Sequence, residues 1–170
     1  EAMGFNHLVS RTSGVKEREL GDLHSIIKSA ISQYSIDGVV SGALASVYQS
    51  TRIQRVCNNL NLWCFNPLWQ MPQKLLLQEL LTKNVESIIT GVAAEPLDAT
   101  WLGRNIDSKS VKELVSLESE YGINPAGEGG EIESFVLDAP LFKRSIRIVD
   151  STKHYSNFAG RLEIKEVKLE

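Results

Sequence analysis

The chain has 170 residues, of which 42% are hydrophobic and 23% are charged, and its net charge is −3. A chain of this length can bury one full core or two small ones, and the composition is that of an ordinary globular protein. The small negative charge gives no electrostatic reason to expect a nucleic acid or a membrane as partner, and no apolar run is long enough to cross a bilayer. We therefore expect a cytoplasmic enzyme or binding protein.

Few residues suggest a metal site. The two cysteines, Cys57 and Cys64, form no CxxC pair and have no nearby pair of histidines, so we expect two reduced thiols packed in a core. His7, His24 and His154 are scattered and have no partner at the spacing of metal ligands or of a catalytic triad. We therefore predict ordinary histidines and assign no residue to a metal.

From residue 5 to about residue 69, short apolar runs alternate with segments in which apolar residues recur at helical spacing. The run DGVVS, for example, is rich in β-branched residues and stops at Gly42, as expected of a buried parallel strand. Strands that alternate with helices indicate right-handed crossovers and a parallel sheet covered on both faces. The predicted elements are strands over Asn6–Ser10, Asp37–Ser41 and Leu62–Phe65 and helices over Lys16–Gln33 and Val47–Leu60.

The pattern changes beyond Trp69, because the strands gather late in the chain without helices between them. Such an order predicts a second domain of α+β type with an antiparallel component. We place the two domains at residues 1–69 and 70–170. In the second domain, the predicted helices are Gln73–Lys83 and Ser110–Tyr121, and the predicted strands are Val85–Ala93, Ser134–Leu137, Ser145–Val149 and Arg161–Leu169.

A first group of candidate site residues follows the strand that ends at Ser41. In open α/β sheets, ligands bind at the carboxyl ends of strands, where helix N-termini present free N–H groups. Gly42 and Ala43 have little or no side chain, so we expect the main chain there to be open to a flat base or a phosphate. Ser46 is a candidate N-cap of the helix that follows.

Two polar residues stand on the first turns of this helix. Gln49 and Arg52 are three positions apart and therefore share one face, and the guanidinium of Arg52 could bind a phosphate or a carboxylate. The alternative is a tight turn followed by an ordinary solvated helix face, with Tyr48 as a packing residue.

The string GEGGEIESFVLD at residues 127–138 is the most unusual segment. Several glycines in succession cost conformational entropy, so the backbone there must need special angles or a close approach. If Glu131 and Glu133 lie on extended backbone, both carboxylates face one side, where Mg²⁺, ammonium or a quaternary ammonium group could bind. The alternative is a flexible acidic surface turn. The segment contains Gly127, Gly129 and Gly130 and the acidic residues Glu128, Glu131 and Glu133.

The string WLGR gives a weaker signal. Trp101 and Arg104 could place an aromatic ring and a guanidinium at the rim of a pocket. A turn that connects two elements and packs its tryptophan is the alternative, and the residues alone favour it.

Three strings together resemble one known family: SGALASVYQSTRIQRVCNNLNL, VAAEPLDATWLGR and YGINPAGEGGEIESFVLDAPLFK are similar to segments of the diphthine–ammonia ligases. The resemblance implies an α/β fold, with an incomplete Rossmann-like parallel sheet of the PP-loop, adenine-nucleotide α-hydrolase-like type and a smaller α+β C-terminal domain. It also implies an ATP-dependent activity, with Mg²⁺, in which the carboxylate of diphthine on elongation factor 2 becomes an acyl-adenylate. Ammonia then displaces AMP to give diphthamide.

The resemblance also distributes roles among the candidate residues. Glutamates of the acidic loop would attract the trimethylammonium group of diphthine, or one of them would take a proton from ammonium, and Glu131→Gln would separate base from binder. The catalytic candidates are Glu128, Glu131 and Glu133. The candidates for nucleotide binding are Gly42, Ala43, Ser46, Tyr48, Gln49 and Arg52. The candidates for substrate binding are Gly127, Gly129, Gly130, Ser134, Trp101 and Arg104.

One signature of the family does not occur in these 170 residues, namely the string SGGKDS that holds the ATP phosphates. We therefore expect this chain alone to be inactive, and the strand edges left open to be covered by a further segment, by closure of the sheet or by a second copy in a homodimer. Two other functions stay open. The chain could belong to another adenylating PP-loop amidase or thiolase, or it could be a non-catalytic module that binds elongation factor 2.

Overall fold

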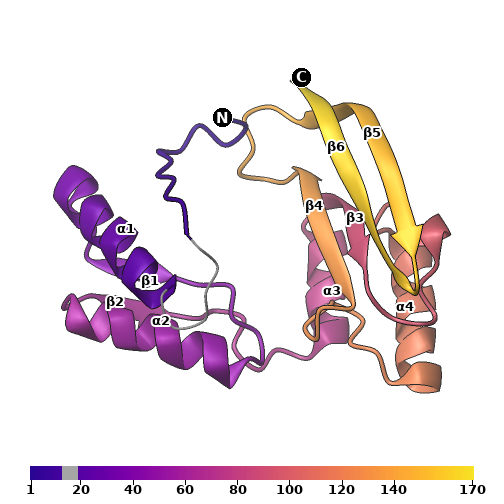
Figure 1. Ribbon diagram of the computed structural model, residues 1–170, viewed down its shortest axis with the longest axis horizontal. Helices are drawn as coiled ribbons and strands as arrows, with labels where there is room; N and C mark the ends of the chain where they lie inside the picture. The colour runs from indigo at the N-terminus through magenta and orange to yellow at the C-terminus, as the bar shows by residue number, and fades with distance from the viewer. Residues whose placement is uncertain (13–18) are drawn as a thin grey trace. The chain divides into compact units, whose positions relative to one another are not determined.

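The computed structural model describes residues 1–12 and 19–170, which divide into two compact units. The N-terminal unit comprises residues Asn6–Met71, and the C-terminal unit comprises Glu1–Phe5 together with Pro72–Glu170 (Figure 1). Among the described residues, no helix combines the length and the apolar character needed to cross a membrane.

The N-terminal unit confirms the predicted alternation of helices and strands after residue 19. Its two strands are parallel, with Val39 opposite Cys64. Ile27, Val56 and the fully buried Cys57 form the centre of its core. Burial, together with the neighbouring Cys64, raises the pKa of the Cys57 thiol to about 11, so Cys57 stays protonated at neutral pH. The elements are α1 (Glu19–Tyr34), β1 (Gly38–Val40), α2 (Val47–Asn59) and β2 (Trp63–Phe65).

Some expectations for this unit are wrong, and others are confirmed only in part. The predicted strand Asn6–Ser10 is wrong, because this segment pairs with no strand in the described part of the chain and its Val9 is 77% exposed. The expected burial of Asp37–Ser41 and the cover on both faces are also wrong, since Val40 and Phe65 are more than half exposed. The first three residues of the predicted helix Lys16–Gln33 lie outside the described residues. The parallel pair is confirmed, whereas its Rossmann-like nature stays a prediction.

The C-terminal unit confirms the predicted α+β arrangement. Its four strands form one antiparallel sheet in the order β4-β3-β6-β5 (Figure 1). The elements are α3 (Gln73–Thr82), β3 (Glu86–Val92), the single 3₁₀ turn η1 (Ala99–Trp101), α4 (Ser108–Tyr121), β4 (Ile132–Asp138), β5 (Ile146–Ser156) and β6 (Ala159–Leu169).

The sheet is joined in its middle by a short contact. β3 pairs with β6 only through Gly91 and Val92. Toward its other end, the same edge of β3 is occupied by the segment 103–106, because the Ile89 N–H donates to the Arg104 carbonyl and the Gly103 N–H donates to the Ile89 carbonyl. Beyond Arg161, β6 therefore has β5 as its only partner strand among the described residues, and the two form a long ribbon.

The core of this unit lies between one face of the sheet and the two helices. Ile89 and Val92 of β3, Ile132 of β4, Leu77 of α3 and Leu114 of α4 are all buried there. At the apolar transfer energy of about 25 cal/mol per Å² of buried surface, such side chains contribute about 1.5–3 kcal/mol each. Residues 1–5 join the unit through the Ala2 carbonyl, which accepts a hydrogen bond from the Lys143 N–H at 2.9 Å.

Three strands are longer than predicted, and one of them is β6, which begins at Ala159, two residues before its predicted start. β4 begins at Ile132, two residues before the predicted start, and β5 continues from the predicted Ser145–Val149 to Ser156. The extension of β5 depends on a tight hairpin, in which Asn157 and Phe158 adopt φ angles of 51° and 61°. Positive φ at both central positions matches the right-handed twist of the strands, and Asn is among the residues that accept it.

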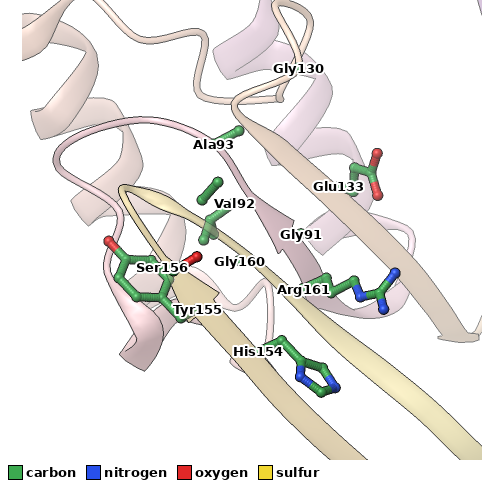
Figure 2. Close-up of a pocket in the computed structure, with 11 residues that line it drawn as sticks. Gly91, Val92, Ala93, Gly130, Glu133, His154, Tyr155, Ser156, Gly160 and Arg161 are labelled. Atoms are coloured by element: carbon green, nitrogen blue, oxygen red, sulfur yellow. The ribbon is translucent and has the colours of Figure 1, made fainter.

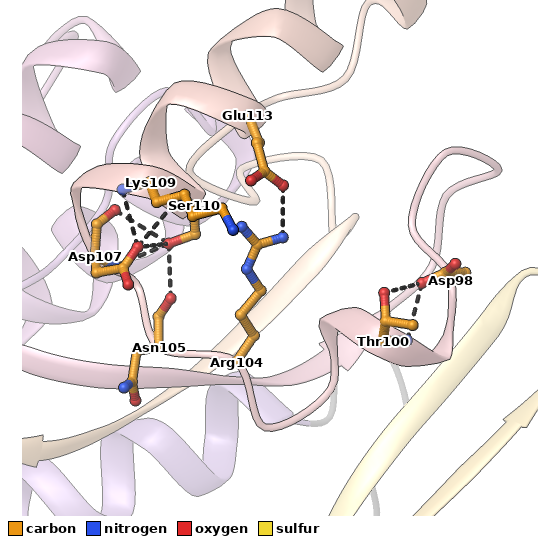
Figure 3. Close-up of polar contacts among 8 residues, drawn as sticks. All are labelled: Asp98, Thr100, Arg104, Asn105, Asp107, Lys109, Ser110 and Glu113. Carbon is orange, nitrogen blue, oxygen red and sulfur yellow. Dashed lines mark hydrogen bonds and ion pairs between the residues drawn. The ribbon is translucent and has the colours of Figure 1, made fainter.

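Helix α4 begins with a reciprocal cap around Asp107. The Asp107 carboxylate accepts hydrogen bonds from the N–H groups of Lys109 and Ser110, and the buried Ser110 hydroxyl accepts one from the Asp107 N–H (Figure 3). The hydrogen bonds from Ser110 are the largest cause that holds the pKa of Asp107 below its usual range. This cap sets the start of α4 at Ser108, two residues before the predicted start.

We expect Asp107→Ala to lower the free energy of unfolding by about 1–2 kcal/mol, because two N–H groups of the first turn lose their acceptor. Urea denaturation followed by circular dichroism measures the loss. Glu118→Ala, at an exposed position of the same helix, is the matched control and should change stability by less than about 0.5 kcal/mol. Equal losses in the two variants would contradict the role of the cap.

Candidate functional site

The carboxyl ends of β1 and β2 are tied together by side chains. The Ser41 hydroxyl donates a hydrogen bond to Asn66 Oδ1 at 2.6 Å and accepts one from the Ala43 N–H at 3.2 Å. The Ser46 side chain accepts a hydrogen bond from the Gln49 N–H at 3.3 Å, which confirms Ser46 as the N-cap of α2. Hydroxyl groups therefore fix both ends of the turn between β1 and α2.

A cavity of about 250 Å³ opens beside the first turns of α2, and it is lined by Tyr48, Gln49 and Arg52 together with residues of α1. The Arg52 guanidinium lies 4.3 Å from the centre of the Tyr48 ring and donates a hydrogen bond to the Tyr48 hydroxyl. Arg52 Nη2 also lies 3.5 Å from the Glu19 carboxylate. An anion that bound Arg52 here would have to displace or share the contact with Glu19.

The two small residues after β1 differ in accessibility. Gly42 is exposed, and a Cβ added there would meet no atom within 4 Å. Ala43 is only 5% exposed, so its main chain is closed to a ligand in this structure, contrary to our expectation. The candidate residues for nucleotide binding thus lie along one turn and one helix, but only some of them face open space.

The glycine-rich segment forms a tight loop between α4 and β4. Gly127 has a φ of +77°, and a Cβ there would lie 2.4 Å from the carbonyl oxygen of Ile132. Gly130 has a φ of +89°. Both values are in the left-handed region, which side chains disfavour, so this path of the backbone requires glycine. The expected need for special backbone angles is confirmed at these two positions.

The side chain of Glu131 stabilises this loop through hydrogen bonds to Asn124. Its Oε1 accepts hydrogen bonds from the Asn124 N–H at 3.1 Å and from Asn124 Nδ2 at 2.7 Å. The Gln73 amide of α3 adds a second layer, because it donates to Asn124 Oδ1 at 2.8 Å and accepts from the Ala126 N–H at 3.0 Å. Burial raises the pKa of Glu131, but hydrogen bonds from its own N–H, Asn124 and Gly129 outweigh burial, so the net pKa lies below the usual value.

The other candidate glutamates have different surroundings. Glu133 is exposed on β4 and lines a cavity of about 430 Å³ together with Gly130 (Figure 2). Glu128 is half-buried in the loop, and Ser134 is exposed. Glu131 does not line this cavity. The expectation that the carboxylates of Glu131 and Glu133 face the same side is therefore wrong, because only Glu133 faces the cavity. Within residues 1–12 and 19–170, no group of three or more His, Cys, Asp or Glu side chains could hold a metal ion.

Trp101 and Arg104 adopt the packed arrangement that the sequence also allowed. Trp101 is 6% exposed and belongs to the core, and the Arg104 guanidinium lies 4.3 Å from the centre of its ring. Arg104 Nη1 also donates to the Glu113 carboxylate at 2.6 Å (Figure 3). This hydrogen bond is the largest cause that raises the pKa of Arg104 and lowers that of Glu113. Both residues therefore tie the segment after η1 to α4.

Sequence reasoning missed several residues at these sites. Asn124 and Gln73 gave no signal, because they meet Glu131 or each other only after folding. Arg161 of β6 and Gly91 of β3 line the cavity beside Glu133, although they are 70 residues apart in the chain. The sequence around either residue does not reveal that the two lie close together, because their proximity depends on the register of the strands.

Both units of the chain match domain models of one known protein family. The C-terminal domain model of diphthamide synthase matches residues 72–169, and the N-terminal domain model of diphthamide synthase matches residues 1–63. The chain belongs to the diphthamide synthase family. The resemblance seen in the sequence is therefore confirmed. The match to the C-terminal domain model begins at Pro72, which is also the first residue of the main segment of the C-terminal unit.

Relatives of the chain from several organisms share one name. Proteins from Bos taurus and Homo sapiens, both named diphthine–ammonia ligase, are 42% and 40% identical to it over 136 residues, which is 79% of the chain and 50% of each relative. The diphthine–ammonia ligase of Schizosaccharomyces pombe is 35% identical over 150 residues, 86% of the chain and 25% of the relative. The chain thus spans about half the length of the bovine and human relatives.

We expect Glu131→Gln to lower the free energy of unfolding at pH 7 by about 1.5–3 kcal/mol, because hydrogen bonds to an ionised acceptor are lost. The pKa of Glu131 is lowered by folding, so its contribution is fully present above the unfolded value of about 4.3 and is lost as the pH falls through the folded value. The difference between wild type and variant should therefore shrink below about pH 4. Urea denaturation at a series of pH values measures it.

The control for this prediction is Glu166→Gln, at an exposed position of β6. It should change stability by less than about 0.5 kcal/mol at any pH between 3 and 7. A Glu131→Gln protein as stable as wild type at pH 7 would show that Glu131 does not hold the loop.

Proposed function

We propose that this chain is part of a diphthine–ammonia ligase that acts in the cytoplasm on elongation factor 2. In the proposed reaction, a carboxylate oxygen of diphthine attacks the α-phosphorus of ATP, and pyrophosphate leaves. Ammonia then attacks the acyl carbon of the adenylate, and AMP leaves as diphthamide forms. Adenylation replaces a poor leaving group by a good one, so the second step is ordinary acyl transfer.

The observation that carries this proposal is the match of both units to the two domain models of one synthase family. The relatives named diphthine–ammonia ligase support the same reaction, because the name specifies diphthine and ammonia as the substrates that are joined. A protein that joins these substrates has to hold both and to stabilise negative charge on phosphate and carbonyl oxygens.

For the nucleotide, we propose the turn after β1 and the first turns of α2 as part of the ATP site, within a Rossmann-like sheet of the PP-loop type. Gly42 is exposed, and the N-terminus of α2 carries a partial positive charge that favours phosphate. Arg52 supplies a guanidinium close to this end of the helix. Mg²⁺ would arrive with ATP and be held largely by its phosphates, as is usual for this cation.

For the diphthine, we propose the acidic loop and the start of β4. Glu133 is exposed and lines a cavity, so its carboxylate can face the trimethylammonium group of the substrate. Glu131 is engaged with Asn124, and we assign it to positioning the loop rather than to proton transfer. Glu128, half-buried in the same loop, is the remaining candidate for accepting a proton from ammonium.

The proposal can be tested with a chimera in which this chain replaces the matched region of the human relative. The chimera is incubated with ATP, Mg²⁺, ammonium and elongation factor 2 that bears diphthine. Mass spectrometry of the modified peptide then reports conversion of the acid to the amide. We expect conversion that requires ATP and releases AMP and pyrophosphate in equal amounts.

Within this chimera, we expect Arg52→Gln to lower the kcat/KM for ATP at least about tenfold, since one guanidinium contact to the nucleotide would be lost. Exchange of labelled pyrophosphate into ATP measures the first step alone. Arg55→Gln is the matched control, because Arg55 is exposed on the same helix and lines none of the cavities described above. It should leave the exchange unchanged.

Other outcomes would favour the two rival functions. Exchange that a small carboxylic acid stimulates, and that diphthine-bearing elongation factor 2 does not, would indicate a different adenylating enzyme. A folded chimera that binds elongation factor 2 but makes neither adenylate nor amide would indicate a docking module. Either result would refute the ligase proposal.

A further inference from the structure

The four-stranded sheet carries a row of residues that runs across all its strands. Gly91 of β3 pairs with Glu133 of β4 on one side and with Arg161 of β6 on the other. Arg161 in turn pairs with His154 of β5. Directly opposed residues of antiparallel strands project to the same face. The order across that face is therefore carboxylate, glycine, guanidinium and imidazole (Figure 2).

This row lies on the face of the sheet that the helices do not cover. Val92, the neighbour of Gly91, pairs with Ile132, the neighbour of Glu133. Both Val92 and Ile132 are buried in the core with α3 and α4. Successive residues of a strand point to opposite faces, so Gly91 and Glu133 point away from the core.

The missing side chain of Gly91 leaves a hollow in the row. The cavity of about 430 Å³ is lined by Gly91, Glu133 and Arg161, among others. A Cβ added at Gly91 would lie 3.0 Å from the Cβ of Glu133 and 3.1 Å from its Oε2, so any side chain there would crowd the carboxylate. Glycine at this position therefore leaves room for the Glu133 side chain, which lies beside it at the cavity.

In the part of the chain that the structure describes, the two charges beside the hollow have no direct partner, although the hydrogen bond from His154 and the charge of Arg161 together lower the pKa of Glu163. Within the described residues, the side chains of Glu133 and Arg161 form no hydrogen bond or ion pair, either with each other or with a neighbour. The nearby Glu163 is engaged by His154, whose Nε2 lies 2.9 Å from its Oε2. Opposite charges that face one cavity without pairing can each bind a complementary group.

We propose that this hollow binds a zwitterionic group, with its cation against Glu133 and its carboxylate against Arg161. A phosphate or another simple anion fits less well, because Glu133 would repel it. A metal cation fits less well, because Arg161 would repel it and a single carboxylate is a poor ligand set. One ligand that carries both charges satisfies both residues at once.

The inference deepens the proposed function and rests on it for the identity of the ligand. The side chain of diphthine has a trimethylammonium group and a carboxylate, so it belongs to the class that this site would accept. Arg161 would then hold the carboxylate before it reacts, as a positioning and specificity-determining residue. Glu133 would select the cation, whereas Glu131 maintains the loop.

A titration followed by NMR tests the site in the 170-residue chain itself. The probe is 2-(trimethylammonio)butanoate, and tetramethylammonium and butanoate supply each charge alone. We expect the zwitterion to shift the amide signals of Gly91, Glu133 and Arg161 and to bind more tightly than either partial probe. Arg161→Gln should weaken binding of the zwitterion about tenfold and leave tetramethylammonium unaffected. Glu133→Gln should weaken binding of both cationic probes.

Arg147→Gln is the matched control for the titration. Arg147 is an exposed arginine near the start of β5, where it pairs with Glu170 at 3.1 Å, and its loss should leave the affinity for the zwitterion unchanged. Amide spectra of each variant show whether the fold is retained, and Arg161→Lys keeps the charge if Arg161→Gln does not fold. Shifts that map elsewhere, or equal affinities of wild type and Arg161→Gln, would overturn the inference.

The chimera separates this inference from the proposed ligase reaction. There, Arg161→Gln should raise the KM for diphthine-bearing elongation factor 2 about tenfold and leave the KM for ATP unchanged. An active chimera whose KM does not respond to Arg161→Gln would refute the inference and leave the ligase function standing. An inactive chimera whose chain still binds the zwitterion through Arg161 would refute the ligase function and leave the site standing.

Discussion

The C-terminal unit depends on the pairing of β3 with β6 at Gly91 and Val92. At this point the hairpin of β5 and β6 joins β3 and β4, and a slip of one residue would exchange the two faces of the sheet. Val92 fixes the register, because it has to enter the core with Ile132. The position of Gly91 between a carboxylate and a guanidinium is thus set by apolar burial on the opposite face.

The acidic loop shows how residues of one type take different parts in a short segment. Glu131 turns inward and accepts hydrogen bonds from Asn124, so its charge is stabilised by the protein. Glu133 lies two residues further on, on β4, and stays in contact with solvent. Glycines with positive φ at Gly127 and Gly130 allow the backbone to change direction between α4 and this strand. The repulsion expected from neighbouring glutamates is reduced because one of them has its own donors.

Much of the fold could be predicted from local patterns. Helices α2 and α4 have strong apolar periodicity, and α3 is rich in leucine. Ser46 was recognisable as a cap because serine accepts hydrogen bonds from the first turn. The strand expected at Asn6–Ser10 failed because a strand needs a partner, and the described chain offers none there. The C-terminal half of β5 was missed because its polar residues, such as Lys153 and His154, lack the alternation of a half-buried strand.

The candidate site was predictable only in part, for a related physical reason. The glycines and glutamates of the loop are close in sequence, so their combination was visible. Arg161 and Gly91 become neighbours only through the pairing of distant strands, and the sequence of each strand alone contains no sign of it. The role of Trp101 was ambiguous in the sequence, because an aromatic ring can pack in a core or line the rim of a pocket. In the structure, Trp101 lies in the core, and the guanidinium of Arg104 lies over its ring.

The segment 103–106 occupies the edge of β3 and thereby leaves the ribbon of β5 and β6 to stand largely by itself. Both long edges of this ribbon carry backbone groups that could pair with a strand of another molecule. Charged residues such as Lys165, Glu166 and Lys168 are spread along β6, and burying them against a foreign strand would be costly. The ribbon is therefore protected from edge-to-edge association by its charges.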